Sequence, residues 1–148
     1  MRLTAVALVV IFLPGAALAL AGGARPVLQG RWIATAGPRT FRGTWSAQAL
    51  PDDANAAAGS WTLLGDADNV VLQGTWSAKK TPRAWRGTWQ ARIQPAGETL
   101  SGTWQAALTT EFKGKTFEDM LQAVGTQQIA GTWRTSRAGG NWWLPALP

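Results

Sequence analysis

The stretch LQGTWSA, residues 72–78, decides the fold of this chain. Its residues alternate in character, because positions 72, 74, 76 and 78 are apolar or glycine and the residues between them are polar. A period of two is typical of a β-strand with one buried face, whereas a helix would scatter these positions around its axis. The same alternation recurs around Trp89 and Trp104, so several strands of this kind are expected.

Copies of the central motif of this stretch, Gly-x-Trp, are spread along the chain. Seven of them set the rhythm: Gly30/Trp32, Gly43/Trp45, Gly59/Trp61, Gly74/Trp76, Gly87/Trp89, Gly102/Trp104 and Gly131/Trp133. Their tryptophans are 13, 16, 15, 13, 15 and finally 29 residues apart. The shorter intervals fit one strand and one tight turn, and they are too short for the crossover that parallel strands need. The repeat therefore predicts an antiparallel meander.

The turns test this interpretation. If the residue between Gly and Trp faces its counterpart on the next strand, each turn is centred midway between two repeats. These midpoints fall at Gly37-Pro38, Asp52, Ala67-Asp68, Thr81-Pro82 and Pro95-Ala96. They are turn-forming residues or lie beside them. In this register each glycine faces a tryptophan of the neighbouring strand, and we expect the indole to cover the bare glycine backbone.

Eight strands are predicted in this way. Their expected ranges are 27–35, 40–49, 56–64, 70–80, 83–93, 99–108, 127–136 and 141–146. An even number allows the first and last strands to pair antiparallel, and closure removes the sheet edges that promote aggregation. The predicted fold class is all-β, an eight-stranded antiparallel up-and-down meander closed into a small barrel. An open sandwich is the alternative.

The segment Thr116–Val124 breaks the strand rhythm and is predicted to form one short helix between strands six and seven. Thr116 and Asp119 resemble a capping box. Its apolar stripe consists of Phe117, Met120, Leu121 and Val124. In a meander this segment lies at the same end as the turns around Asp52 and Thr81-Pro82. We expect it to cover that end of the barrel, and packing on the outer wall is the alternative.

Tryptophan is expected to replace a scarce aliphatic core. After residue 21 the chain has only about twenty Leu, Ile, Val and Phe residues, a low share for a globular domain. Each buried indole removes about 150 to 250 Å² from water, which contributes roughly 4 to 6 kcal/mol before entropy is counted. The predicted structural core is formed by Trp32, Trp45, Trp61, Trp76, Trp89, Trp104 and Trp133.

The first residues differ from the rest of the chain. A positive start at Arg2, an apolar run over Leu3–Leu13 and small residues before position 22 are typical of a secretory signal peptide. We predict a signal peptide at 1–21 and a single β-barrel domain at 22–148, exported to the periplasm or the extracellular space. The apolar run is short for a membrane anchor, so no transmembrane helix is expected after cleavage.

Catalytic chemistry has few candidate residues here. The chain has no His, Cys or Tyr, which removes histidine bases, thiol nucleophiles and the usual zinc ligands. The acidic pairs Asp52/Asp53 and Asp66/Asp68 are typical of turns, and calcium takes about six to eight oxygen ligands. Glu98 and Glu111 have no evident partner for two-carboxylate hydrolysis. We therefore predict a protein that is not an enzyme, with no catalytic residues, no metal and no cofactor.

The first functional hypothesis rests on architecture. The predicted barrel resembles the lipocalin and avidin type, and Gly30-Arg31-Trp32 is similar to the Gly-x-Trp that opens lipocalins. This likeness covers three residues and is one of architecture only. It implies an interior that binds a small apolar or amphipathic ligand, with a mouth opposite the predicted helix. The mouth would lie among residues 35–40, 65–69, 94–98 and 137–141.

Two alternatives remain open. The first is a structural accessory protein or a binder of envelope glycans or other anionic polymers, since without Arg2 thirteen basic residues face eight acidic ones. The candidate ligand-binding residues are Trp142, Trp143, Arg86 and Arg92. Trp142 and Trp143 are adjacent, so on a strand they point to opposite faces and one of them is expected to be exposed or at the mouth.

The second alternative is a small outer-membrane β-barrel whose tryptophans face lipid. Such barrels place their aromatic residues in two girdles at the interfaces, whereas these tryptophans stand at strand centres. Nucleic acid is disfavoured as a partner, because an exported protein rarely meets it. No oligomeric state follows from the sequence.

Overall fold

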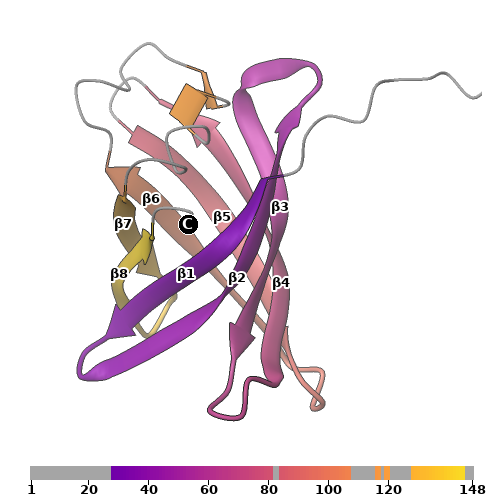
Figure 1. Ribbon diagram of the computed structural model, residues 1–148, viewed down its shortest axis with the longest axis vertical. Coiled ribbons are helices and arrows are strands. Elements are labelled where there is room, and N and C mark those ends of the chain that lie inside the picture. Colours follow the sequence, from indigo (N-terminus) through magenta and orange to yellow (C-terminus); the bar gives the residue numbers. More distant parts are fainter. Residues whose placement is uncertain (1–27, 82–83, 108–115, 118, 121–127, 146–148) are drawn as a thin grey trace, which may run out of the picture.

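The computed structural model describes residues 28–81, 84–107, 116–117, 119–120 and 128–145. The strands are β1 (Leu28–Ala36), β2 (Arg39–Leu50), β3 (Asp53–Leu64), β4 (Val70–Lys80), β5 (Ala84–Ile93), β6 (Thr99–Ala107), β7 (Ile129–Arg134) and β8 (Gly139–Leu144). Each strand pairs antiparallel with the next, and β8 pairs with β1 to close a barrel (Figure 1). The predicted fold class is confirmed and the open sandwich is wrong. The predicted signal peptide at 1–21 lies outside the described residues.

Alternate residues of each strand face the barrel interior. In β4, positions 72, 74, 76 and 78 are buried or half-buried, whereas positions 73, 75, 77 and 79 are exposed. The inward positions carry all the tryptophans except Trp143, together with most of the glycines and alanines, and the outward positions carry mainly threonine, serine, glutamine and basic residues. The alternation seen in the sequence is therefore the inside and outside of the barrel wall.

β8 carries an eighth copy of the repeat, Gly140/Trp142, which the seven-copy pattern leaves out. In the β7–β8 pair, Gly131 faces Trp142 and Trp133 faces Gly140. Each of the eight strands thus has one Gly-x-Trp, and the barrel consists of four hairpins with the same internal register.

The predicted register is confirmed within hairpins and wrong between them. Gly59 faces Trp76 in β3–β4, as expected. Between β2 and β3, however, Thr44 pairs with Thr62 instead of Ser60. The β4–β5 pair is displaced in the same way, so tryptophan faces tryptophan at these contacts instead of glycine.

Barrel closure explains this displacement. Strands of a closed barrel must be staggered so that they tilt by about 35–45° to its axis, and a register with all repeat centres level has no stagger. In the predicted register the residue between Gly and Trp on one strand pairs with its counterpart on the next strand. The observed pairing is displaced from that register by two residues at β2–β3, β4–β5 and β6–β7 and by four residues at β8–β1. The total stagger is therefore ten residues, and all of it lies between hairpins.

The tryptophans lie in two layers, as expected when inward residues of alternate strands stack in a barrel. The layer on the odd-numbered strands, here called the mouth layer, consists of Trp32, Trp61, Trp89 and Trp133. The layer on the even-numbered strands, here called the inner layer, consists of Trp45, Trp76, Trp104 and Trp142. T-shaped contacts with ring centroids 5.5 to 5.8 Å apart link members of each layer. This edge-to-face geometry is the one that aromatic pairs prefer.

Glycine and tryptophan also pack on each other. The indole of Trp76 lies against Gly59, and its Nε1–H donates to the backbone carbonyl of Ser46 at 2.9 Å. Trp104 lies against Gly87 in the same way and donates to Ser77 at 3.1 Å. A Cβ at Gly59 would overlap the Ser46 carbonyl oxygen, so this close approach of backbone and indole requires glycine.

The indole hydrogen bonds lead to a stability prediction. Trp76 donates to Ser46, whereas the buried Nε1 of Trp61 has no hydrogen-bond partner. We expect Trp76→Phe to lower the free energy of unfolding by about 1 kcal/mol more than Trp61→Phe, because only the first change leaves a carbonyl without its donor. Urea unfolding followed by circular dichroism measures both values. Equal losses in the two variants would show that the hydrogen bond contributes no stability.

Phe117 and Met120 fill one end of the barrel. Phe117 is 1% exposed, and its ring lies 4.4 Å from that of Trp85 and 6.0 Å from that of Trp76. Both residues belong to the buried cluster that contains Trp45 of the inner layer. Figure 1 shows this segment at the same end as the β2–β3 turn. The segment therefore covers this end, here called the closed end, and does not pack on the outer wall.

The helix predicted over 116–124 is not seen in the described part of the chain. Its capping-box contacts are present: the Thr116 N–H and hydroxyl both donate to the Asp119 carboxylate at 2.9 Å, and the Asp119 N–H donates to Thr116 Oγ1 at 3.2 Å. Leu121 and Val124 lie outside the described residues. No helix long and apolar enough to cross a membrane occurs among the residues that the structure describes.

Candidate functional site

Four turns form the end of the barrel opposite Phe117, here called the mouth. They span residues 37–38, 65–69, 94–98 and 135–138. Figure 1 shows the turns after β1, β3 and β5 together at the lower end, as the meander predicts. The mouth is therefore built from hairpin turns, whereas Phe117 and Met120 fill the closed end.

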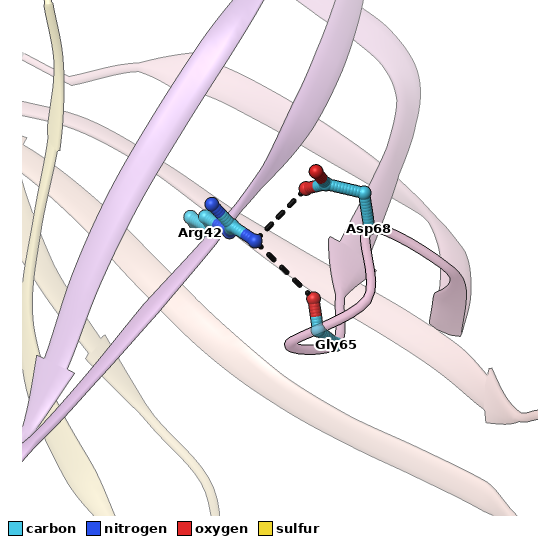
Figure 2. Close-up of polar contacts among 3 residues, drawn as sticks. All are labelled: Arg42, Gly65 and Asp68. Atoms are coloured by element: carbon cyan, nitrogen blue, oxygen red, sulfur yellow. Dashed lines mark hydrogen bonds and ion pairs between the residues drawn. The ribbon is translucent and has the colours of Figure 1, made fainter.

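Arg42 attaches one of these turns to the wall (Figure 2). Its guanidinium lies 2.9 Å from the Asp68 carboxylate and donates to the Gly65 carbonyl at 3.4 Å. Asp68 has a φ of 58°, a left-handed conformation that aspartate tolerates better than most residues. Because the two side chains are 54% and 73% exposed, the pair contributes less than about 1 kcal/mol. Its role is to position the turn at the rim.

The inward face near the mouth is apolar and incompletely covered. It is formed by Phe41, Leu63, Leu72, Ile93 and Leu100, here called the mouth collar. Leu63 faces Leu72, and Leu72 in turn faces Ile93, so the collar is continuous across three strands. Four of these side chains are half-buried and Leu100 is 37% exposed.

The two halves of the interior therefore differ. In the closed half, Trp85 and Phe117 are 0% and 1% exposed. In the mouth half, Trp61, Trp89 and Trp133 are all half-buried, beside the partly exposed collar. None of the side chains of the mouth collar or the mouth layer is charged. The mouth half is thus an uncharged aromatic and aliphatic surface.

The predicted ligand-binding residues do not form one site. Trp142 faces inward and packs against the buried cluster, whereas Trp143 faces outward and pairs with Ile33 across the β8–β1 contact. Arg86 and Arg92 are exposed on the outer face of β5. The barrel wall separates Trp142 from the other three, and those three share the outer surface.

The predicted core tryptophans are buried to different degrees. Trp45 is 7% exposed, and the inner-layer residues Trp76 and Trp104 are half-buried against the same cluster. The most buried tryptophan is Trp85, which has no glycine two residues before it and was not among the predicted core. The alternation around Trp89 places Trp85 on the inner face, so this signal was present in the sequence.

No metal centre is formed by the residues that the structure describes. They contain no group of three or more Asp or Glu residues placed to hold an ion. Asp53 lies 3.8 Å from Lys79, Asp68 binds Arg42, and Glu111 lies outside the described residues. The chain matches no protein-family model, no curated protein and no solved structure. Any functional conclusion therefore depends on the geometry of the barrel.

Proposed function

We propose that this protein is an exported, non-enzymatic barrel that binds a small apolar or amphipathic molecule in its mouth half. The observation that carries the proposal is the difference between the two ends. Phe117 and Met120 close one end, while the mouth collar and mouth layer leave apolar side chains partly exposed at the other. A contiguous apolar surface of this kind is typical of a ligand site. Export is inferred from residues 1–21.

The lining defines the chemistry of the ligand. An ionised group placed beside Leu72 and Ile93 would lose its hydration without gaining an oppositely charged partner, which is costly in an apolar surrounding. The part of the ligand inside the barrel is therefore uncharged, and any polar group lies at the rim of turns. A hydrocarbon chain or a flat apolar ring system meets these requirements.

The outer wall favours this function over a membrane-embedded barrel. A lipid-facing wall carries an apolar band about 25 Å tall. Here Thr75, Thr88 and Thr103 stand at the outward centres of β4, β5 and β6, and all three are exposed. Serine, glutamine and Arg86 occupy the neighbouring outward positions, and the pair Ser77 and Thr88 is hydrogen-bonded at 3.1 Å. The apolar band is on the inner face of the described strands instead.

Native mass spectrometry tests the proposal. We expect protein purified from its host without detergent to carry a bound small molecule in addition to the polypeptide mass. Leu72→Gln places a polar amide in the collar and is expected to abolish retention of that molecule. Thr75→Gln introduces the same side chain on the outer face of the same strand and is expected to retain it.

The interpretation depends on both variants being folded, which their near-ultraviolet circular dichroism establishes. The proposal fails if the wild-type protein has the bare polypeptide mass and also binds neither dodecanol nor methyl laurate added in solution. Equal loss of the bound molecule in both variants would instead place its site outside the collar.

A further inference from the structure

The outer wall from β4 to β8 carries basic side chains and no acidic ones among its described outward positions. The basic residues are Lys79 on β4, Arg86 and Arg92 on β5, and Arg134 on β7, here called the basic strip. All of them are exposed. Asp53, at the start of β3, reaches only Lys79, at 3.8 Å. The strip is therefore a surface of one charge sign.

The position of two of these cations is unfavourable for the barrel alone. Lys79 and Arg86 face each other directly across the β4–β5 pair. Like charges at opposed positions of a sheet destabilise it. Arg86, Arg92 and Arg134 form no ion pair with any described residue, in contrast to Arg42, which binds Asp68. An anionic partner would relieve this repulsion.

Hydrogen-bonding side chains fill the space between the cations. Ser77, Thr88 and Thr103 form one row across β4, β5 and β6, and Thr75, Gln90 and Ser101 form the next row. A surface hollow of about 540 Å³ surrounds the β7–β8 turn next to Arg134 of the strip, and its lining includes Arg137 and Asn141. Hydroxyl and amide groups at this density are suited to a partner that is itself rich in hydroxyl groups.

One aromatic side chain faces outward at the edge of this surface. Trp143 of β8 is half-buried and pairs with Ala130 of β7 on one side and Ile33 of β1 on the other. An indole on a polar wall offers a flat apolar face to a sugar ring. Trp143 is two residues from Asn141 on the same face of β8. Asn141 belongs to a row of cross-strand neighbours that continues through Thr132 and Gln105 to Arg86 of the basic strip.

We propose that the outer wall from β4 to β8 binds an anionic polysaccharide. Arg86 and Arg92 are six residues apart on one strand, a distance of about 20 Å. Only an extended polymer contacts both. Single-stranded nucleic acid is disfavoured because it binds to rows of aromatic platforms, and Trp143 is the only outward tryptophan on the described strands. This proposal is independent of a ligand in the barrel mouth.

Three polymers distinguish the partner classes. Polygalacturonate carries carboxylates on sugar rings, polyglutamate carries carboxylates without sugars, and oligo(dT) represents nucleic acid. We expect the protein to bind polygalacturonate at least tenfold more tightly than polyglutamate of equal charge, with an affinity that falls as salt rises. Fluorescence anisotropy of labelled polymers gives these affinities. Equal binding to polyglutamate, or tighter binding to oligo(dT), would overturn the assignment to a polysaccharide.

Matched variants locate the surface. The double variant Arg86→Gln, Arg92→Gln is expected to lose about tenfold or more in affinity for polygalacturonate. The double variant Arg31→Gln, Arg39→Gln removes the same charge from β1 and β2, outside the basic strip, and is expected to lose less than about threefold. Equal losses would show that net charge alone determines binding and would overturn the proposal. Because all four side chains are exposed, neither variant is expected to unfold.

Discussion

Gly87→Ala is expected to lower the free energy of unfolding by about 2 to 4 kcal/mol. A Cβ at this position would overlap the Ser77 carbonyl oxygen and lie 2.6 Å from Nε1 of Trp104, so two strands and an indole would have to move apart. Overpacking of this kind costs about 1 to 3 kcal/mol, and the displaced Trp104 hydrogen bond adds about 1 kcal/mol. Denaturant unfolding of the purified variant measures the change.

Gly37→Ala provides the control for this experiment. Gly37 has a φ of +55°, and a Cβ there would meet nothing within 4 Å, so the substitution tests backbone conformation without a steric clash. We expect it to cost about 1 kcal/mol. If Gly87→Ala were no more destabilising than Gly37→Ala, the repeated glycines would not be required by the close approach of neighbouring strands.

Phe117→Ala is expected to destabilise the barrel by about 3 to 5 kcal/mol, the range for a large aromatic side chain removed from a packed site. Phe117 is 1% exposed and contacts Trp85 and Trp76, and both tryptophans would lose contacts to a cavity. The reason for the large effect is that Phe117, together with Met120, fills the closed end of the interior. Thermal and urea unfolding both report the change.

Leu100→Ala is the matched change at the opposite end. Leu100 is 37% exposed in the mouth collar, so we expect a loss of about 1 kcal/mol or less. A similar loss in the Phe117 and Leu100 variants would contradict the distinction between a packed closed end and an incompletely covered mouth. That distinction also supports the proposed ligand site, so the comparison bears on function as well as stability.

Local patterns in the sequence predicted most of the fold. The predicted turn centres at Gly37-Pro38 and Asp52 are confirmed, because these residues connect observed strands. Such turns are predictable because the residue types that they require depend on local backbone conformation. The inward face of β4 was correct because burial alternates residue by residue. Strand boundaries followed from the same two signals, and barrel closure followed from the even number of strands and the removal of sheet edges.

The register between hairpins was not predictable from local patterns. Thr44 pairs with Thr62 because the whole closed barrel must be staggered, and that requirement appears only when all eight strands are considered together. A displacement by two residues keeps every side chain on its own face, so alternation does not reveal it. The adjacent Trp143 favours a ligand-binding role for Trp142, whereas Gly140 identifies Trp142 as a member of the repeat.

The candidate site was predicted only in part. The sequence placed the mouth at the correct turns, but the collar residues Leu63, Leu72 and Ile93 carry no motif, and only the strand pairing brings them together. Arg86 and Arg92 were selected for their charge, and the structure adds that Lys79 faces Arg86 directly. The partner that these surfaces bind depends on side-chain arrangement across strands, which one sequence does not contain.

The hydrogen bond from Trp133 Nε1 to the Thr35 carbonyl, 3.1 Å long, has a consequence for the order of folding. Trp133 lies on β7, and its indole reaches past Gly140 of β8 to Thr35 on β1. The bond therefore links residues that are 98 positions apart and supports the closure between β8 and β1, whereas every other strand pair joins neighbours in the chain. Closing so long a loop costs more chain entropy than closing a hairpin, and contacts between distant residues slow folding. We therefore expect the hairpins to form first and the β1–β8 contact to form last, so that pairing of the first and last strands completes the barrel.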